Sequence, residues 1–318
     1  MPRTRHYRYS RHMFTNTSNK HTHTPGRANL GLFLLYQITT MFPIIIRRTI
    51  LKRWIRLYST PSHLQKSIMS TPECILVGIS GPSSSGKTTL SRHLRDIFSP
   101  STFILHEDDF YKPDADIPTH LTAQIADWDC LGSLNLPALH SALRHIKAHA
   151  AAPPDLSSKE DQNEVGKSGV DGKVIDELRS QARNLLQDGN ITVAIVDGFL
   201  LFSEEMKEIR EVFDVKLFLR TDYSTAKRRR EARSGYVTIE GFWEDPPGYV
   251  ENVVWPNYVR DHAFMFERGD VDGTLDEAKC AQLGIAGMPR QLQGDMTGCV
   301  TWAYEVLSKA LVENKPKK

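Results

Sequence analysis

Residues 81–88, Gly-Pro-Ser-Ser-Ser-Gly-Lys-Thr, combine the residue types that hold the phosphate groups of a nucleotide. They fit the pattern G-x-x-x-x-G-K-[ST] of a phosphate-binding loop. Gly81 and Gly86 permit backbone angles that side chains forbid, so successive N–H groups can turn toward an anion. Lys87 places a cation on the β- and γ-phosphates, and the hydroxyl of Thr88 is suited to bind Mg²⁺. The loop therefore predicts binding of a nucleoside triphosphate.

The segments on either side of this loop must position it. The mostly apolar run 75–80 precedes it, and residues 89–94 continue with helical spacing. A helix that begins in such a loop points its free N–H groups at the phosphates. We therefore expect the whole loop to bind the nucleotide, through Gly81, Pro82, Ser83, Ser84, Ser85, Gly86, Lys87, Thr88 and Thr89.

Acidic side chains follow two further apolar runs. Asp108 comes after the run 102–106, and Asp197 ends the run that starts at residue 191. The carboxyl ends of parallel strands lie at one edge of a sheet, so both side chains are expected to face the phosphate loop. Asp108 is predicted to accept a proton from an attacking hydroxyl or to bind Mg²⁺, and Asp197 to hold Mg²⁺ directly or through water. The alternative for Asp108 is a helix N-cap or turn role, and the alternative for Asp197 is a turn residue before Gly198.

A strongly basic segment, residues 227–233 with sequence KRRREAR, has two interpretations. It is either the solvated face of a helix or a lid whose guanidinium groups offset charge on a transferring phosphate. Helical spacing places Arg229 and Arg233 on one face and Arg230 on another.

Composition and charge narrow the class of protein. The chain has 318 residues and 40% apolar composition, enough for one large domain. No acidic residue precedes Glu73, so the remainder is net acidic by roughly ten charges, which argues against a nucleic-acid-binding core. The four cysteines form no C-x-x-C pair. We therefore expect neither disulfides nor a cysteine metal site. Such cysteine usage fits a reducing compartment, and the expected location is the cytoplasm.

The basic N-terminal extension, residues 1–72, is not expected to be part of the fold. Three interpretations remain open. Residues 28–46 carry no charge and approach the length of a membrane span, although polar residues and Pro43 weaken it. Residues 44–58 resemble an Arg-rich mitochondrial presequence. Alternatively, translation begins at Met69, just before the first predicted strand.

The rest of the chain, residues 73–318, alternates strand and helix patterns. This predicts an α/β fold of the P-loop NTPase type, a parallel sheet flanked by helices with right-handed crossovers and an Arg-rich lid helix. We predict a surface insertion at residues 151–172 and a helix end at residues 188–190. The expected strands are 74–80, 102–106, 191–196, 215–219 and one near 264–267. The expected helices are 88–98, 136–149, 174–186, 225–233 and 297–311.

The motifs taken in order resemble those of nicotinamide riboside kinases. They are GxxxxGKTTL, DDFYKP, the pair Trp128-Asp129, DGFLLF, KRRRxxR, PPGYV with VWPxY, and a DGT turn. The resemblance covers about residues 74–277. In four places the chain departs from it. The family often has Glu where Asp197 stands, the loop between Arg233 and Pro246 is longer here, and residues 151–172 and 278–296 have no counterpart.

The resemblance implies roles for further residues. Asp108 would be the proton acceptor, beside the Mg²⁺ that Thr88 binds. Asp129 would accept hydrogen bonds from the ribose 2′- and 3′-hydroxyls. The implied substrate-binding residues are Asp108, Asp109, Phe110, Tyr111, Trp128, Asp129, Arg230 and Tyr236. The implied ATP-binding residues beyond the loop are Arg229 and Arg233 on the phosphates, with Leu275, Asp276 and Glu277 beside adenine.

These observations predict a kinase that transfers the γ-phosphoryl group of ATP, with Mg²⁺, to the 5′-hydroxyl of nicotinamide riboside. Nicotinic acid riboside is the expected second substrate, and neither nucleic acid nor, for the kinase domain, a membrane is an expected partner. A uridine-type nucleoside kinase is the enzymatic alternative. A nucleotide-binding regulator without a small substrate is the other class, and two separate acids with an Arg-rich helix disfavour it. ADP release that requires a nucleoside would separate these two classes.

Overall fold

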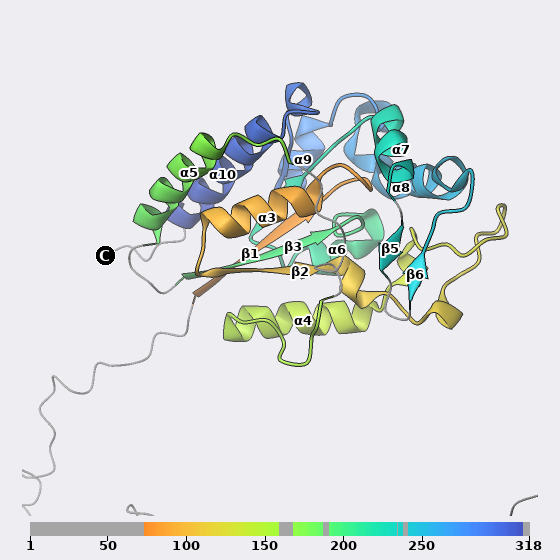
Figure 1. The fold of residues 1–318 in the computed structure, drawn as a ribbon, viewed down its shortest axis with the longest axis horizontal. Coiled ribbons are helices and arrows are strands. Elements are labelled where there is room, and N and C mark those ends of the chain that lie inside the picture. The colour runs from red at the N-terminus through yellow and green to blue at the C-terminus, as the bar shows by residue number, and fades with distance from the viewer. Residues whose placement is uncertain (1–72, 159–167, 187–190, 234, 238–240, 314–318) are drawn as a thin grey trace, which may run out of the picture. The chain divides into compact units, whose positions relative to one another are not determined.

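The computed structural model describes residues 73–158, 168–186, 191–233, 235–237 and 241–313, and Figure 1 shows helices on both sides of a central sheet. The strands are β1 (Glu73–Ser80), β2 (Thr102–His106), β3 (Ile191–Gly198), β4 (Val215–Phe218), β5 (Tyr236–Val237), β6 (Phe242–Trp243) and β7 (Ile285–Gly287). The helices are α3 (Lys87–Ile97), α4 (Leu136–His149), α5 (Gly172–Leu185), α6 (Lys207–Arg210), α7 (Tyr223–Glu231), α8 (Trp255–His262), α9 (Glu277–Leu283) and α10 (Met296–Glu313).

The main sheet is parallel throughout, with strand order β2-β3-β1-β4-β7. Its strands are rich in β-branched and other apolar residues, as strands buried on both faces must be. The register places Asp197 opposite both Ile79 of β1 and His106 of β2. The strand ends that carry the predicted site residues therefore lie at one edge, and the predicted α/β fold, a parallel sheet flanked by helices, is confirmed.

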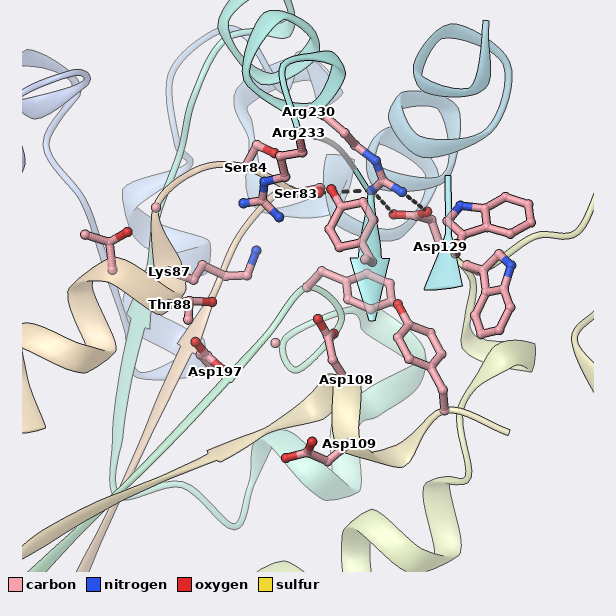
Figure 2. A pocket seen from close by; sticks show the side chains of 18 residues that line it. Ser83, Ser84, Lys87, Thr88, Asp108, Asp109, Asp129, Asp197, Arg230 and Arg233 are labelled. Carbon is pink, nitrogen blue, oxygen red and sulfur yellow. Dashed lines mark hydrogen bonds and ion pairs between the residues drawn. The ribbon is translucent and has the colours of Figure 1, made fainter. Parts of the chain in front are cut away.

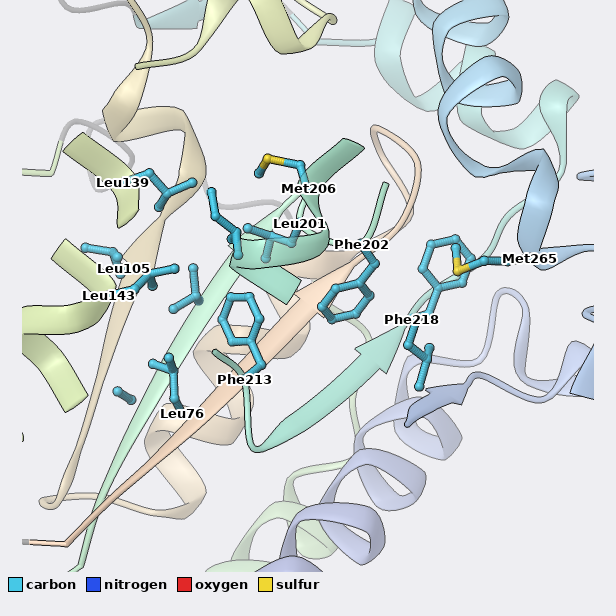
Figure 3. Packing of buried hydrophobic residues seen from close by; sticks show 14 of the residues in the cluster. Leu76, Leu105, Leu139, Leu143, Leu201, Phe202, Met206, Phe213, Phe218 and Met265 are labelled. Atoms are coloured by element: carbon cyan, nitrogen blue, oxygen red, sulfur yellow. The ribbon is translucent and has the colours of Figure 1, made fainter. Parts of the chain in front are cut away.

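Alternate residues of the central strands pack into two separate cores. Leu76 of β1 packs with Leu139 and Leu143 of α4, as Figure 3 shows. Its neighbours Ile75 and Val77 pack on the opposite face, with α3, α5 and α10. Each fully buried Leu, Ile or Val contributes about 1.5–3 kcal/mol to folding. These two cores fix the sheet edge that holds the site.

Local sequence signals account for the starts of several helices. The side chain of Asn135 accepts a hydrogen bond from the Ala138 N–H at the start of α4, and Pro137 is tolerated in that first turn. Asp171 caps α5 in the same way. The helix end predicted at residues 188–190 lies outside the described residues, as does the middle of the predicted insertion, 159–167.

The strand predicted near residues 264–267 is wrong. That segment forms a 3-10 turn, Ala263–Met265, and Phe266 makes only an isolated bridge to Leu275. Met265 and Phe266 are buried from this turn, so their apolar character reflects core packing rather than a strand. The fifth strand is β7, which pairs with β4 and lies in the segment 278–296 that had no assignment. At three residues ending in glycine, β7 is too short to give a strand pattern.

We propose that residues 73–318 are the folded domain, and we expect the polypeptide Met69–Lys318 to fold by itself. The two cores of the described residues draw on side chains from Cys74 to Leu311. Thermal unfolding of this polypeptide and of the full chain, followed by circular dichroism, should give the same midpoint. A markedly lower midpoint for the shorter chain would show that residues 1–68 stabilise the domain.

Candidate active site

The phosphate loop joins β1 to α3, and several of its residues have backbone φ angles that favour glycine. Gly81 and Gly86 have φ angles of 146° and 99°, and Ser84 has a φ of 61°. A Cβ at Gly81 would lie 2.3 Å from the backbone oxygen of Leu219, so no larger residue fits there. Helix α3 begins at Lys87 with Gly86 as its N-cap, and Gly86 lacks a side chain that would cover the free N–H groups. The loop is thus shaped for an anion.

A pocket opens over this loop, and Figure 2 shows the side chains that line it. Its lining residues come from the loop, from the ends of β2 and β3, from the segment around Trp128 and from α7 with the hairpin that follows. They are Ser83, Ser84, Gly86, Lys87, Thr88, Thr89, Asp108, Asp109, Tyr111, Trp128, Asp129, Asp197, Gly198, Phe199, Arg230, Arg233, Tyr236 and Trp243. The pocket therefore gathers most of the predicted site residues from distant parts of the chain.

One side of the pocket combines a cation with two carboxylates. Figure 2 shows Lys87, Thr88 and Asp197 close together, with Asp108 across from them. The Nζ atom of Lys87 donates a hydrogen bond to the Pro82 carbonyl at 2.9 Å, which holds the side chain back over its own loop. Burial lowers the pKa of Lys87, while the carboxylates of Asp108 and Asp197 oppose that shift. The arrangement suits an ATP phosphate chain with a divalent cation.

The Asp197 carboxylate has one oxygen fixed and one available. His106 Nδ1 lies 2.6 Å from Asp197 Oδ1, and both side chains are buried. Asp197 Oδ2 is buried and has no hydrogen-bond partner within the described part of the chain. A buried carboxylate oxygen without a partner is costly unless a ligand satisfies it. This oxygen, the Thr88 hydroxyl and Asp108 therefore fit a Mg²⁺ ion, which prefers oxygen ligands and keeps several waters.

The described residues contain no cluster of three or more His, Cys, Asp and Glu side chains arranged for a metal. Mg²⁺ does not require one, because one or two carboxylates and the substrate phosphates usually complete its shell.

Sequence reasoning missed Glu107, which is fully buried beside the site. Its Oε2 atom accepts hydrogen bonds from the backbone N–H groups of Phe199 at 2.7 Å and Leu200 at 3.0 Å. Burial raises the pKa of Glu107 to about 8. A Cβ at Gly198 would meet this carboxylate at 2.5 Å, which explains the glycine. Glu107 thus fixes the segment after β3 against the segment that carries Asp108.

The other side of the pocket is built on a buried ion pair. Arg230 donates to both carboxylate oxygens of Asp129, at 2.7 and 2.9 Å. It also donates to the Ser83 hydroxyl at 3.0 Å and to Asp245, so it links the loop to two acidic segments. Burial alone would lower the pKa of Arg230, but the carboxylates of Asp129 and Asp245 raise it well above its ordinary value. The guanidinium is therefore charged.

The backbone next to Asp129 is also fixed. Asn257 of α8 donates hydrogen bonds to the Asp127 carboxylate and to the Asp129 carbonyl. The Asp127 carboxylate in turn accepts the Asp129 N–H at 3.1 Å. This segment is thus held by α8, far along the chain.

Aromatic rings form much of the remaining wall. Tyr111 meets Trp128 edge-on at 5.3 Å between ring centroids and lies nearly parallel to Phe199 at 6.3 Å. Trp128 also contacts Trp243 at 5.6 Å. Trp128 Nε1 and Tyr236 Oη are buried and have no hydrogen-bond partner among the described residues, as expected of groups that bind a polar ligand. The wall suits a flat, polar ring.

The faces predicted for the three arginines are wrong. Helix α7 ends at Glu231, so Arg233 lies beyond it and helical spacing does not apply. Arg230 and Arg233 both line the pocket, and each guanidinium lies 5.2 Å from the Tyr236 ring centroid. Arg229 instead donates to the Ser84 carbonyl at 3.3 Å and does not line the pocket.

Other predicted residues lie elsewhere. Phe110 is buried in the core cluster that contains Leu105 and Leu139, and it does not line the pocket. Leu275 is in the same core, and Asp276 caps α9 through the Lys279 N–H. Neither residue, nor Glu277, lines the pocket.

Asp109 lines the pocket, but Figure 2 shows it on the far side of Asp108 from Lys87, and its carboxylate accepts a hydrogen bond from Ser158. Gly81, Pro82 and Ser85 belong to the loop, but they do not line the pocket.

Phe199, Trp243 and Asp245 were missed as well. Phe199 follows Asp197-Gly198, and that proximity to a candidate acid was the available signal. Trp243 and Asp245 stand in the long loop after the basic segment, where no motif marks them.

Among the described residues, no helix has the length and apolarity needed to cross a bilayer. The uncharged run 28–46 and the presequence-like run 44–58 lie outside the described part.

Several curated proteins that are similar to this chain are named nicotinamide riboside kinase. The nicotinamide riboside kinase of Schizosaccharomyces pombe is 45% identical over 206 residues, 64% of this chain and 86% of that protein. The nicotinamide riboside kinase of Saccharomyces cerevisiae is 37% identical, over 66% of this chain and 87% of its own length. Human nicotinamide riboside kinase 1 is 28% identical, over 64% and 85%.

No protein-family model matches the chain. Among solved structures, a possible uridine kinase from Bacillus stearothermophilus aligns with a TM-score of 0.37 and 17% identity, over 67% of this chain and 96% of that one. The fold therefore rests on the strand order and parallel pairing described above.

Proposed function

The chain belongs to the nicotinamide riboside kinase family, and we propose that its pocket transfers the γ-phosphoryl group of ATP to the 5′-hydroxyl of nicotinamide riboside. The product is nicotinamide mononucleotide, a precursor of NAD. The 45% identity over most of the S. pombe kinase is the observation that carries this function. The pocket supports it, because a phosphate loop, two acids and an aromatic wall border a single space.

The phosphate end works by positioning and charge. We propose that the loop N–H groups and Lys87 hold the ATP phosphates, and that Arg233 approaches them from the segment after α7, which serves as the Arg-rich lid. Arg229 acts there only through the loop carbonyl it contacts. Fixed cations at this place offset the charge that spreads over the transferring group.

Thr88 and Asp197 would hold Mg²⁺, with Asp108 beside it. The ion, when bound, neutralises part of the phosphate charge. Asp108 is exposed to the pocket opposite Lys87, so its carboxylate can accept the proton of the attacking 5′-hydroxyl.

The riboside end works by hydrogen bonding and stacking. Asp129 accepts the ribose hydroxyls, and the rings of Tyr111, Trp128 and Tyr236 accept the flat pyridinium by stacking and cation–π attraction. Nicotinic acid riboside has the same ring and sugar and is the proposed second substrate. We place the reaction in the cytoplasm.

A substrate panel tests the function. Purified enzyme with ATP and Mg²⁺ is given nicotinamide riboside, nicotinic acid riboside, uridine and cytidine, and ADP release is measured by a coupled assay. We expect the highest kcat/KM with nicotinamide riboside and almost no ADP release without a riboside. Uridine or cytidine as the best substrate would instead make the protein a pyrimidine nucleoside kinase. If ADP is released at the same rate with and without a riboside, the protein is instead a nucleotide-binding regulator without a small substrate.

A further inference from the structure

Asp245 is a half-buried acid behind the riboside end of the pocket, and no sequence motif marks it. It follows strand β6, and its side chain is 17% exposed. Its carboxylate accepts hydrogen bonds from Arg230 Nε at 2.6 Å, from Arg230 Nη2 at 3.1 Å and from Trp243 Nε1 at 2.8 Å. Asp245 does not line the pocket, so any effect on substrate must pass through Arg230 or Trp243.

The guanidinium of Arg230 has no donor left for another partner. It carries five N–H groups in a rigid plane. Nε donates to Asp245, Nη1 to Asp129 and Ser83, and Nη2 to Asp129 and Asp245. Its orientation is therefore set from both sides, by one carboxylate in the pocket and one behind it.

The carboxylate of Asp129 keeps room for a ligand. A carboxylate has about four acceptor positions, and Arg230 occupies one on each oxygen. One position on each oxygen is left, which matches two neighbouring hydroxyl groups. The Asn257 contacts fix the backbone here but leave the carboxylate free to turn about its last bond. Among the described residues, the two hydrogen bonds from Arg230 are what fix that rotation.

The charges of these three side chains also link Asp245 to Asp129 through Arg230. The single guanidinium of Arg230 is shared by two carboxyl groups, those of Asp129 and Asp245. Without Asp245 the cation would act on Asp129 alone and weaken it as an acceptor.

We propose that Asp245 is a positioning residue for ribose recognition. Its hydrogen bonds orient the Arg230 guanidinium, and Arg230 in turn holds the Asp129 carboxylate in the orientation that accepts both ribose hydroxyls. The inference rests on the proposed function, because it takes a riboside as the substrate. It predicts that the preference for ribose over 2′-deoxyribose depends on a residue outside the pocket.

The test compares Asp245→Asn with Glu244→Gln, which makes the same chemical change at the exposed neighbouring residue. For each protein, KM and kcat are measured with nicotinamide riboside and with 2′-deoxynicotinamide riboside at saturating ATP. In Asp245→Asn we expect KM for the riboside to rise about tenfold or more, as for loss of a charged hydrogen-bond pair. KM for the deoxyriboside should rise less, because only its 3′-hydroxyl can use the carboxylate, and kcat and KM for ATP should change little. Glu244→Gln should match the parent protein.

A second variant guards against misfolding. Asp245→Glu keeps the charge with a longer arm and should retain part of the ribose preference, while Asp129→Ala sets the lower limit. Thermal unfolding identifies which variants are folded. An unchanged ribose-to-deoxyribose ratio in a folded Asp245→Asn protein would overturn the inference, as would an equal loss with both substrates, which indicates general structural damage. Failure of the parent protein to phosphorylate nicotinamide riboside would instead remove the proposed function.

Discussion

Replacement of Lys87 by alanine will lower phosphoryl transfer by roughly 10²- to 10³-fold, as for loss of one fixed group that stabilises transition-state charge. Lys87 is the cation that the phosphate loop itself supplies, and its Nζ lies over the loop at the Pro82 carbonyl. Asp108 and Asp197 face it, so without it two carboxylates would stand near the phosphates without this counter-charge. The measurement is ADP release with saturating nicotinamide riboside.

The matched control is Lys309→Ala, which removes an exposed lysine from α10, distant from the loop in sequence. It should keep the parent activity, and both variants should unfold at the parent temperature. Near-normal turnover in Lys87→Ala would contradict the phosphate-loop mechanism.

Replacement of Asp108 by asparagine should remove the proton acceptor and keep the shape of the site. General base catalysis contributes about 10²- to 10⁴-fold, so turnover should fall in that range. Nucleotide binding should persist, because the loop and Lys87 are unchanged. Isothermal titration with a non-hydrolysable ATP analogue measures the binding, and the coupled assay measures the turnover.

Asp116→Asn is the control for this variant, since Asp116 is an exposed acid on the same segment. It should have no effect on either measurement. If Asp108→Asn fails to fold, Asp108 is a structural residue of the 3-10 turn Glu107–Phe110 rather than a catalytic one.

Local sequence patterns predicted much of the fold, because the residues concerned interact with neighbours that are near them in the sequence. The strand 102–106 and the helix 136–149 were predicted with the bounds that the structure shows. Their apolar periodicity is intact, and a cap and a proline mark the start of the helix. The phosphate loop was also predictable from the sequence. Its glycines are required by backbone angles that are set within a segment of eight residues.

Predictions failed where the same residue type fits two different structural roles. The aromatic and apolar residues near 264 resembled a strand but fill the core from a turn. Phe110 resembled a site residue because its neighbours are, yet a one-residue step in the turn points it into the core. Arg233 was placed by helical spacing, although the helix ends before it.

The sequence by itself determined that this chain has a phosphate loop on a parallel α/β sheet, with acids at the strand ends. Short-range spacing carries that information. Only the tertiary structure decided which arginine meets which acid. Arg230 and Asp129 are 101 positions apart, and Asp245 joins them from a loop without a motif. An ion pair of this kind depends on where packing places three separate segments, because a guanidinium pairs with whichever carboxylates are buried beside it.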